Sequence, residues 1–179
     1  LSGAVAIWLM NGTTIANSGF PAGVPLEWQI AGMGDVNADN KADVIWRNTT
    51  DGLVAVWLMN GLTVTSTGFP GGATLNYVIK EIGDVDGNGT ADLVWEDIIN
   101  HGVAVWLMNG TTVAFAGFPG GVPAGWKISG MGDVNADGQS DVILQNTTHG
   151  AVAFWLMDGN AVIMRTVFPS GTSTDWEIQ

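Results

Sequence analysis

Apolar residues lie in short runs that recur along the chain at a fixed interval of 49 residues. The clearest marker of this repeat is the tripeptide Trp-Leu-Met, which begins at Trp8, Trp57, Trp106 and Trp155. Each tripeptide is followed by Asn-Gly or Asp-Gly, and such a pair favours a type I′ turn between two antiparallel strands. No window of helical length has apolar residues at i, i+3, i+4 and i+7 between capping residues. The pattern therefore predicts an all-β protein built from hairpins.

The last repeat indicates how the strands divide within one unit. We expect strands at 140–146, 151–157 and about 161–167, and a short fourth strand around Trp176. Four short antiparallel strands in a period of about 40–50 residues are typical of a β-propeller blade. A single sheet of this size cannot bury both of its faces, so neighbouring units must stack. The recurring Trp and Met side chains are expected to form the core between the units.

Acidic and amide residues gather in three loops of the form D-x-[DN]-x-[DN]-[GN]-x-x-D, again 49 residues apart. Positions 1, 3, 5, 7 and 9 of the first loop are Asp35, Asn37, Asp39, Lys41 and Asp43. The same positions of the second loop are Asp84, Asp86, Asn88, Thr90 and Asp92. Those of the third loop are Asp133, Asn135, Asp137, Gln139 and Asp141. Oxygen atoms at positions 1, 3 and 5 can converge only if the chain wraps around one point. Position 6 is Asn40, Gly89 or Gly138, residue types that tolerate the positive φ of such a turn.

These loops are predicted to bind calcium, about three ions per chain. Hard oxygen ligands in this number suit Ca²⁺ better than zinc or copper, and Mg²⁺ holds its waters too tightly. Position 7 would supply a backbone carbonyl, and position 9 the closing carboxylate. An EF-hand is excluded, because position 12 is Trp46, Trp95 or Leu144 rather than Glu and no helix follows. The alternative is that Asp and Asn only build surface turns, but three complete copies argue against it.

The loops and hairpins together resemble the FG-GAP/VCBS-type repeat, the calcium-binding blade of integrin-α-like propellers that is common in exported bacterial proteins. The resemblance rests on residues 34–46, 83–95 and 132–144 and on the Trp-Leu-Met hairpins, and it covers essentially the whole chain. It implies a β-propeller-type array of four-stranded antiparallel blades with calcium in the loops between strands. It also implies a secreted or cell-surface protein, of bacterial origin, that serves adhesion, glycan binding or display. Since many activities share such a fold, the family does not define one of them.

The repeats divide residues 1–179, a single domain, into about four units. We expect a partial blade at 1–33, which lacks its calcium-loop strand, and blades at 34–82, 83–131 and 132–179. Three outcomes for the missing strand stay open: further repeats of a longer chain, another copy that completes a ring or a fibre, or a domain that tolerates the gap. The first residue is Leu1 rather than Met, which favours a processed product or a segment of a longer chain.

The composition narrows the classes of function. The net charge of −12 argues against nucleic acid as a partner. Nine of the 17 acidic residues lie in the three loops, and such crowding is costly unless a cation offsets it. Cysteine is absent, which excludes disulfides and thiol chemistry. No apolar run reaches the roughly 18 residues that a membrane span needs, and no signal peptide is visible.

The sequence favours a non-catalytic, calcium-stabilised extracellular module for adhesion, structural assembly or display. His101 and His149 stand outside any nucleophile motif, and Glu96 with Asp97 occurs in one unit only, so we expect no enzyme. Two alternatives stay open, a glycan-binding propeller and an accessory domain of a secreted enzyme. Glycans would need exposed aromatic residues, and the candidates are Trp28, Tyr77, Trp126 and Trp176. The expected partners are calcium, other copies or a longer parent chain, and glycans or surface proteins.

Overall fold

A computed structural model describes residues 2–168 of the chain. These residues form sixteen β-strands and no helix, so the prediction of an all-β protein is confirmed. With no helix in this part of the chain, none is long and apolar enough to cross a membrane.

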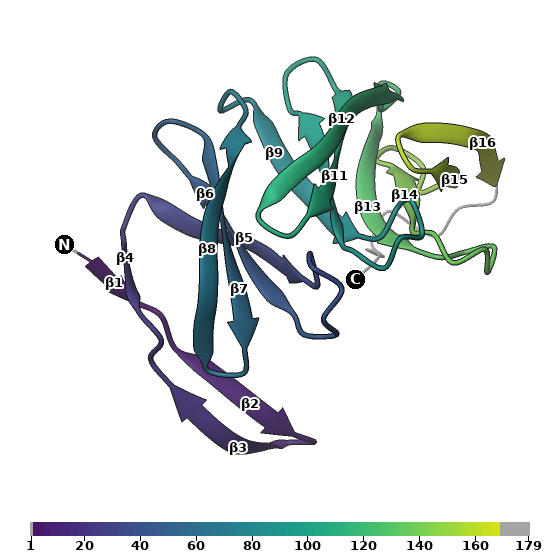
Figure 1. The fold of residues 1–179 in the computed structure, drawn as a ribbon. Helices are drawn as coiled ribbons and strands as arrows, with labels where there is room; N and C mark the ends of the chain where they lie inside the picture. The colour runs from purple at the N-terminus through teal and green to yellow at the C-terminus, as the bar shows by residue number, and fades with distance from the viewer. Residues whose placement is uncertain (1, 169–179) are drawn as a thin grey trace.

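Three four-stranded antiparallel sheets follow one another along the chain (Figure 1). The first sheet consists of β5 (Trp28–Gly34), β6 (Asp43–Asn48), β7 (Leu53–Asn60) and β8 (Thr63–Gly72). The second consists of β9 (Tyr77–Gly83), β10 (Asp92–Asp97), β11 (Gly102–Asn109) and β12 (Thr112–Gly121). The third consists of β13 (Trp126–Gly132), β14 (Asp141–Asn146), β15 (Val152–Asp158) and β16 (Ala161–Phe168). Within each sheet the strands pair in chain order, so every connection is short.

The N-terminal residues form half of such a sheet. Strand β1 (Ser2–Ala4) pairs with β4 (Gly23–Pro25), and β2 (Ile7–Asn11) pairs with β3 (Thr14–Gly19). One repeat later, the same positions belong to β7 and β8. The half-sheet therefore corresponds to the third and fourth strands of a complete sheet. It lacks two strands, whereas the sequence predicted a partial blade at 1–33 that lacks only its calcium-loop strand.

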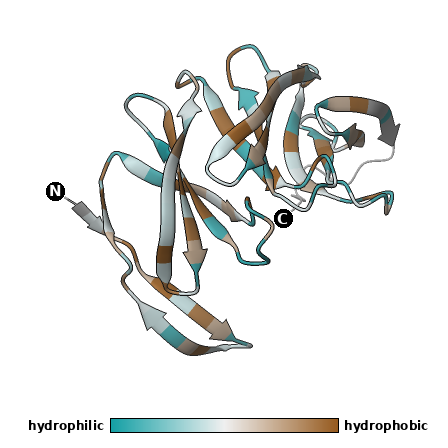
Figure 2. Cartoon of the chain, viewed as in Figure 1, coloured by the Kyte–Doolittle hydropathy of each residue, from teal (hydrophilic) through white to brown (hydrophobic). Residues whose placement is uncertain are grey.

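The hydrophobic core lies between successive sheets. On β6 and β7, Trp46 and Trp57 pack towards the N-terminal half-sheet, whereas Ile45 and Val56 pack towards the second sheet. Because both faces are covered, these strands are apolar along most of their length (Figure 2). The same division recurs between the second and third sheets. The prediction that Trp and Met form the core between units is confirmed for these junctions.

Glycines on the fourth strands allow the sheets to approach closely. A Cβ on Gly68 would come within 2.4 Å of the side chain of Thr111, and one on Gly117 within 2.1 Å of that of Asn160. Both neighbours belong to the hairpin turn of the next sheet. In the half-sheet, Gly19 similarly faces Leu62 at 3.2 Å. The tip of each hairpin thus packs onto a position without a side chain.

The sheets differ from the predicted blades in where they begin. Each sheet starts one strand earlier than the expected boundaries at 34, 83 and 132. The reason is that the acidic loop joins neighbouring strands of one sheet, so that Gly34 pairs with Asp43 and Met33 with Val44. Strands β5, β9 and β13 thus belong to the units that follow them. The predicted strand around Trp176 lies outside the described residues. No closed ring is detected in the described part of the chain, so only the stacked sheets are established.

The hairpins lie where the Asn-Gly pairs predict them, but the type of turn is different. Asn11 pairs with Thr14, so the two central residues are Gly12 and Thr13 rather than Asn11 and Gly12. Gly12 has a φ of 59°, and among these residues it alone has a positive φ. Glycine with positive φ at the first central position fits a type II′ turn, whereas type I′ requires positive φ at both positions. The prediction of a type I′ turn is therefore wrong.

The repeat offers a matched test of the core. Met157 is fully buried, whereas Met10 at the equivalent position of the half-sheet is 55% exposed. Met157→Ala is expected to lower the free energy of unfolding by about 2–5 kcal/mol, because a buried methionine leaves a cavity. Met10→Ala should change it by less than about 0.5 kcal/mol. Urea unfolding of the two variants measures both values, and equal losses would contradict this assignment of the core.

Candidate metal centre

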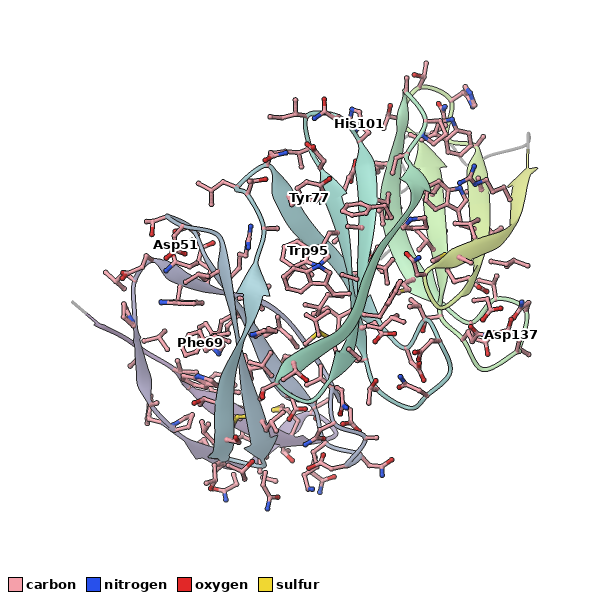
Figure 3. All side chains as sticks on the ribbon, turned by 45° about the horizontal axis from the view of Figure 1, so that its top comes forward. Asp51, Phe69, Tyr77, Trp95, His101 and Asp137 are labelled. Carbon is pink, nitrogen blue, oxygen red and sulfur yellow. The ribbon has the colours of Figure 1, made fainter. Side chains whose placement is uncertain are left out.

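The three acidic loops lie at the same ends of their sheets. Each loop joins the first strand of a sheet to the second, on the side where the hairpin turns also lie. Asp137 marks one of these loops in Figure 3, whereas Asp51 and His101 lie in turns at the opposite ends of the strands. All three predicted sites therefore lie at the same ends of the strands, which we call the loop rim of the stacked sheets.

The aspartate at position 1 organises each loop through backbone hydrogen bonds. Asp35 Oδ1 accepts from the N–H of Asp39 at 3.1 Å, and Oδ2 accepts from that of Asn40 at 2.6 Å. Asp84 and Asp133 accept from the same loop positions in the second and third loops. These bonds bend the backbone around the carboxylate, as a convergent set of oxygen ligands requires.

Two positions of each loop take up a left-handed backbone conformation. At position 6, Asn40, Gly89 and Gly138 have φ values of 63°, 87° and 89°, so the prediction for this position is confirmed. At position 4, Ala38, Gly87 and Ala136 also have positive φ, at 58°, 72° and 63°. The sequence did not suggest the second position, because alanine disfavours this region by roughly 1–2 kcal/mol.

The aspartate at position 9 has a structural role that sequence analysis missed. The carboxylate of Asp43 is fully buried, and its Oδ2 accepts from the N–H of Val36 at 3.1 Å. Its Oδ1 accepts from the N–H of Met59 on β7 at 2.8 Å. Asp92 and Asp141 form the same pair of bonds in their own sheets. Each of these carboxylates therefore ties the acidic loop to the hairpin strand beside it.

The second loop brings three predicted ligands together. One carboxylate oxygen each from Asp84, Asp86 and Asp92 lies within 4.8 Å of the others. Oxygen atoms bound to one Ca²⁺ at 2.3–2.6 Å can lie up to about 5 Å apart, so this spacing fits the ion. Among the described residues it is the one group of three acidic or histidine side chains found at this spacing. In the first and third loops position 3 is an amide, Asn37 or Asn135, which offers one uncharged oxygen.

The remaining predicted ligands have other contacts. At position 5, Asp39, Asn88 and Asp137 each accept from the backbone N–H of position 7, at 3.0, 2.7 and 2.9 Å. The side chains at position 7 also have partners. Lys41 pairs with Asp39 of its own loop, and Thr90 Oγ1 contacts both Asn88 Oδ1 and the carbonyl of Met108. Gln139 accepts from the N–H of Gly159. The backbone carbonyl of position 7 stays a predicted ligand.

The charges of the second loop are costly without a cation. Burial raises the pKa of Asp92 to about 7, and the neighbouring charges of Asp86 and Asp84 add to the rise. Burial also raises the pKa of Asp86. In the third loop the N–H of Gly138 and other backbone donors lower the pKa of Asp133 instead. A bound divalent ion would favour the ionised forms of Asp92 and Asp86.

The first two loops also contact the unit that follows each of them along the chain. The carbonyl of Asp35 accepts from the N–H of Ala91 in the second loop at 2.6 Å, and that of Val36 accepts from Gly110 at 2.6 Å. The carbonyls of Asp84 and Val85 accept in the same way from Ser140 and Gly159 in the third sheet, at 2.6 and 2.7 Å. A change in loop order would therefore act on the junction between two sheets.

Comparison with known proteins gives no further guidance to the site. No protein-family model, curated protein or solved structure matches the chain.

Substitutions of Asp92 and Asp86 should distinguish the structural role of the position 9 aspartate from the binding of a metal ion. Asp92→Ala leaves two buried N–H groups without acceptors, and we expect it to destabilise the calcium-free protein by about 2–5 kcal/mol. Asp86→Ala should cost less than about 1 kcal/mol without calcium, because its carboxylate bonds only within the exposed loop. Urea unfolding in EGTA measures both effects. A loss for Asp86→Ala as large as that for Asp92→Ala would contradict the division of roles.

Proposed function

We propose that this protein is a calcium-stabilised, non-catalytic module of stacked propeller-type sheets that serves adhesion, structural assembly or display outside the cell. The proposal rests on one observation: the second acidic loop both gathers carboxylates and contacts the following sheet. The second loop gathers three carboxylates, and the carbonyls of its first two residues accept hydrogen bonds from the third sheet. An ion bound there would order the loop and thereby strengthen the junction.

The residues that break the repeat have structural contacts, which supports a non-catalytic role. Glu96 is buried and lies 3.4 Å from Lys80 Nζ and 3.1 Å from His101 Nδ1. Asp97 is also buried, and it accepts from the N–H groups of Ile99 and Asn100 in the following turn. Both carboxylates thus have protein partners that hold the turn after β10.

Calcium should set the stability of the protein. Extracellular calcium modules have Kd values of about 10⁻⁴–10⁻³ M. At about 1 mM calcium and a Kd near 0.1 mM, each site adds about 1.4 kcal/mol, and three sites add about 4 kcal/mol. We expect the melting temperature to rise by about 10 °C between EGTA and 1 mM calcium, as measured by calorimetry.

Matched variants make the calcium test specific. Asp84→Ala should remove about a third of the increase, whereas Asp51→Ala at the opposite rim should leave it unchanged. Magnesium at the same concentration should give a much smaller increase. A melting temperature that is the same in EGTA and in calcium would contradict the proposal.

A second candidate function, glycan binding, is favoured by an aromatic groove between the first and second sheets. The groove has a volume of about 360 Å³, and Tyr77, Trp106 and Phe118 contribute accessible aromatic rings, whereas Trp95, which also borders it, is only 1% exposed. Figure 3 shows Tyr77 and Trp95 in this region. The two Trp rings lie 4.8 Å apart, and Phe118 is 73% exposed. The negative faces of such rings attract the C–H groups of a sugar.

Phe118 provides a test of glycan binding that should not disturb the fold. If the groove binds sugars, Phe118→Ala should weaken binding on a glycan array by at least about tenfold. Phe20→Ala changes an equally exposed residue of the half-sheet and serves as the control. Absence of any bound glycan, or equal binding by both variants, would exclude this second function.

A further inference from the structure

A pocket lies between the first and second sheets, at the ends of the strands opposite the acidic loops. It has a volume of about 420 Å³ and is formed by the starts of β5 and β9, the end of β6 and the segment before β9. Both sheets have all four strands, so this pocket lies at an internal junction of the array. Among the described residues that line it, Arg47 is the one that carries a charge. We name it the Arg47 pocket.

The guanidinium of Arg47 is held in place by uncharged partners of the second sheet and of the segment that leads to it. Its Nη2 donates to three carbonyl oxygens at 2.7, 3.1 and 3.3 Å, those of Ala73, Thr74 and Tyr77. Its Cζ lies 4.9 Å from the centre of the Trp95 ring, which is a cation–π contact. These contacts fix the position of the positive charge, but none of them supplies a negative one.

The charge of Arg47 is therefore unpaired. In the described part of the chain, no carboxylate lies within ion-pair distance of its guanidinium. Its Nη1 is enclosed by the protein and has no acceptor. Burial lowers the pKa of Arg47, and the negative charge of Asp51 opposes this shift only in part. A cation that loses water without gaining an anion is costly, so an anion that enters the pocket would be attracted to it.

The second unit gives the matched comparison, because it also has a charge at this position. Glu96 is the equivalent of Arg47, and it lies 3.4 Å from Lys80 Nζ and 3.1 Å from His101 Nδ1. The first unit has uncharged residues at the positions of both partners. The chain thus places a cation beside Glu96, whereas among the described residues it places no anion beside Arg47.

We propose that the Arg47 pocket binds a small organic carboxylate that carries an aliphatic group. The carboxylate lies beside Arg47, whose single charge matches it better than the double charge of a phosphate. The aliphatic group contacts the apolar wall formed by Leu75, Val78 and Ile79. Leu75 is 53% exposed, so this wall is open to a ligand, and the volume is in the range that holds small molecules. The inference goes beyond the proposed function, because neither calcium nor a glycan takes part.

Three related compounds test the two parts of the ligand separately. N-acetyl-leucine has a carboxylate and an aliphatic side chain, N-acetylleucinamide lacks the charge, and N-acetylglycine lacks the side chain. In titrations followed by nuclear magnetic resonance, N-acetyl-leucine should bind at least about tenfold more tightly than either of the other two. Equal binding of N-acetyl-leucine and N-acetylleucinamide overturns the proposal, and so does equal binding of N-acetyl-leucine and N-acetylglycine.

A parallel titration with hexanoate distinguishes two sources of the same chemistry. Tighter binding of hexanoate indicates a free aliphatic acid as the ligand, and tighter binding of N-acetyl-leucine indicates the C-terminus of a peptide. The titrations are made in EGTA, so that their outcome does not depend on calcium. Absence of binding by both aliphatic carboxylates overturns the proposal and leaves the calcium-dependent function unaffected.

Variants of the pocket locate the bound carboxylate. Arg47→Gln removes the charge and introduces the residue type of Gln145, the equivalent position of the third unit. It should weaken the binding of N-acetyl-leucine by at least about tenfold. Leu75→Glu retains Arg47 and its contacts, so it tests the pocket even if Arg47→Gln does not fold. Its carboxylate takes the place of the ligand and should weaken binding to a similar extent.

Leu26→Glu is the matched control for Leu75→Glu. Leu26 is the equivalent residue one unit earlier, it is 60% exposed, and it lies outside the Arg47 pocket. Leu26→Glu should bind N-acetyl-leucine like the parent protein, and melting temperatures should show that both glutamate variants are folded. Unchanged binding in Leu75→Glu, or an equal loss in Leu26→Glu, contradicts the assignment of the ligand to this pocket.

Discussion

The fold depends on one recurring interaction, a fully buried aspartate whose two carboxylate oxygens accept from separate backbone segments. Asp43 joins the acidic loop at Val36 to the hairpin strand at Met59, and Asp92 and Asp141 do the same in their own sheets. Burying a charge is costly unless hydrogen bonds replace its water. These bonds also fix the backbone at Val36, which is the residue after the aspartate at position 1.

Much of the architecture could be predicted, because it follows from local patterns that recur. The 49-residue spacing, the apolar runs and the loop formula identified the hairpins, the stacked sheets and the left-handed turn at position 6. The role of Asp43 could not be predicted, since an aspartate that accepts N–H groups and one that binds a metal look alike in sequence. The sheet boundary at Trp28 was missed for a related reason: a repeat has no natural starting point, and only strand pairing decides which neighbour a strand joins.

The acidic loops and the sheet junctions form one connected system. The carbonyls of Asp35 and Val36 accept from the next sheet, while the side chain of Asp35 shapes its own loop. Residues that differ between the units, such as Glu96 and Asp97, lie at the opposite ends of the strands. The loop ends of the sheets therefore share one hydrogen-bonding pattern, although only the second loop gathers three carboxylates, while Glu96 and Asp97 distinguish the second sheet at the opposite ends of its strands.

The small fourth-strand glycines have a consequence for the shape of the array. Gly68 and Gly117 let the hairpin tip of the following sheet rest directly on the backbone, at one end of the strands only. A side chain at either place would act as a wedge on that side and open the angle between two sheets. Because both positions are glycine, the hairpin tips of the second and third sheets can pack against the preceding sheet in the same way. The distance between successive sheets at this end thus depends on two residues that have no side chain.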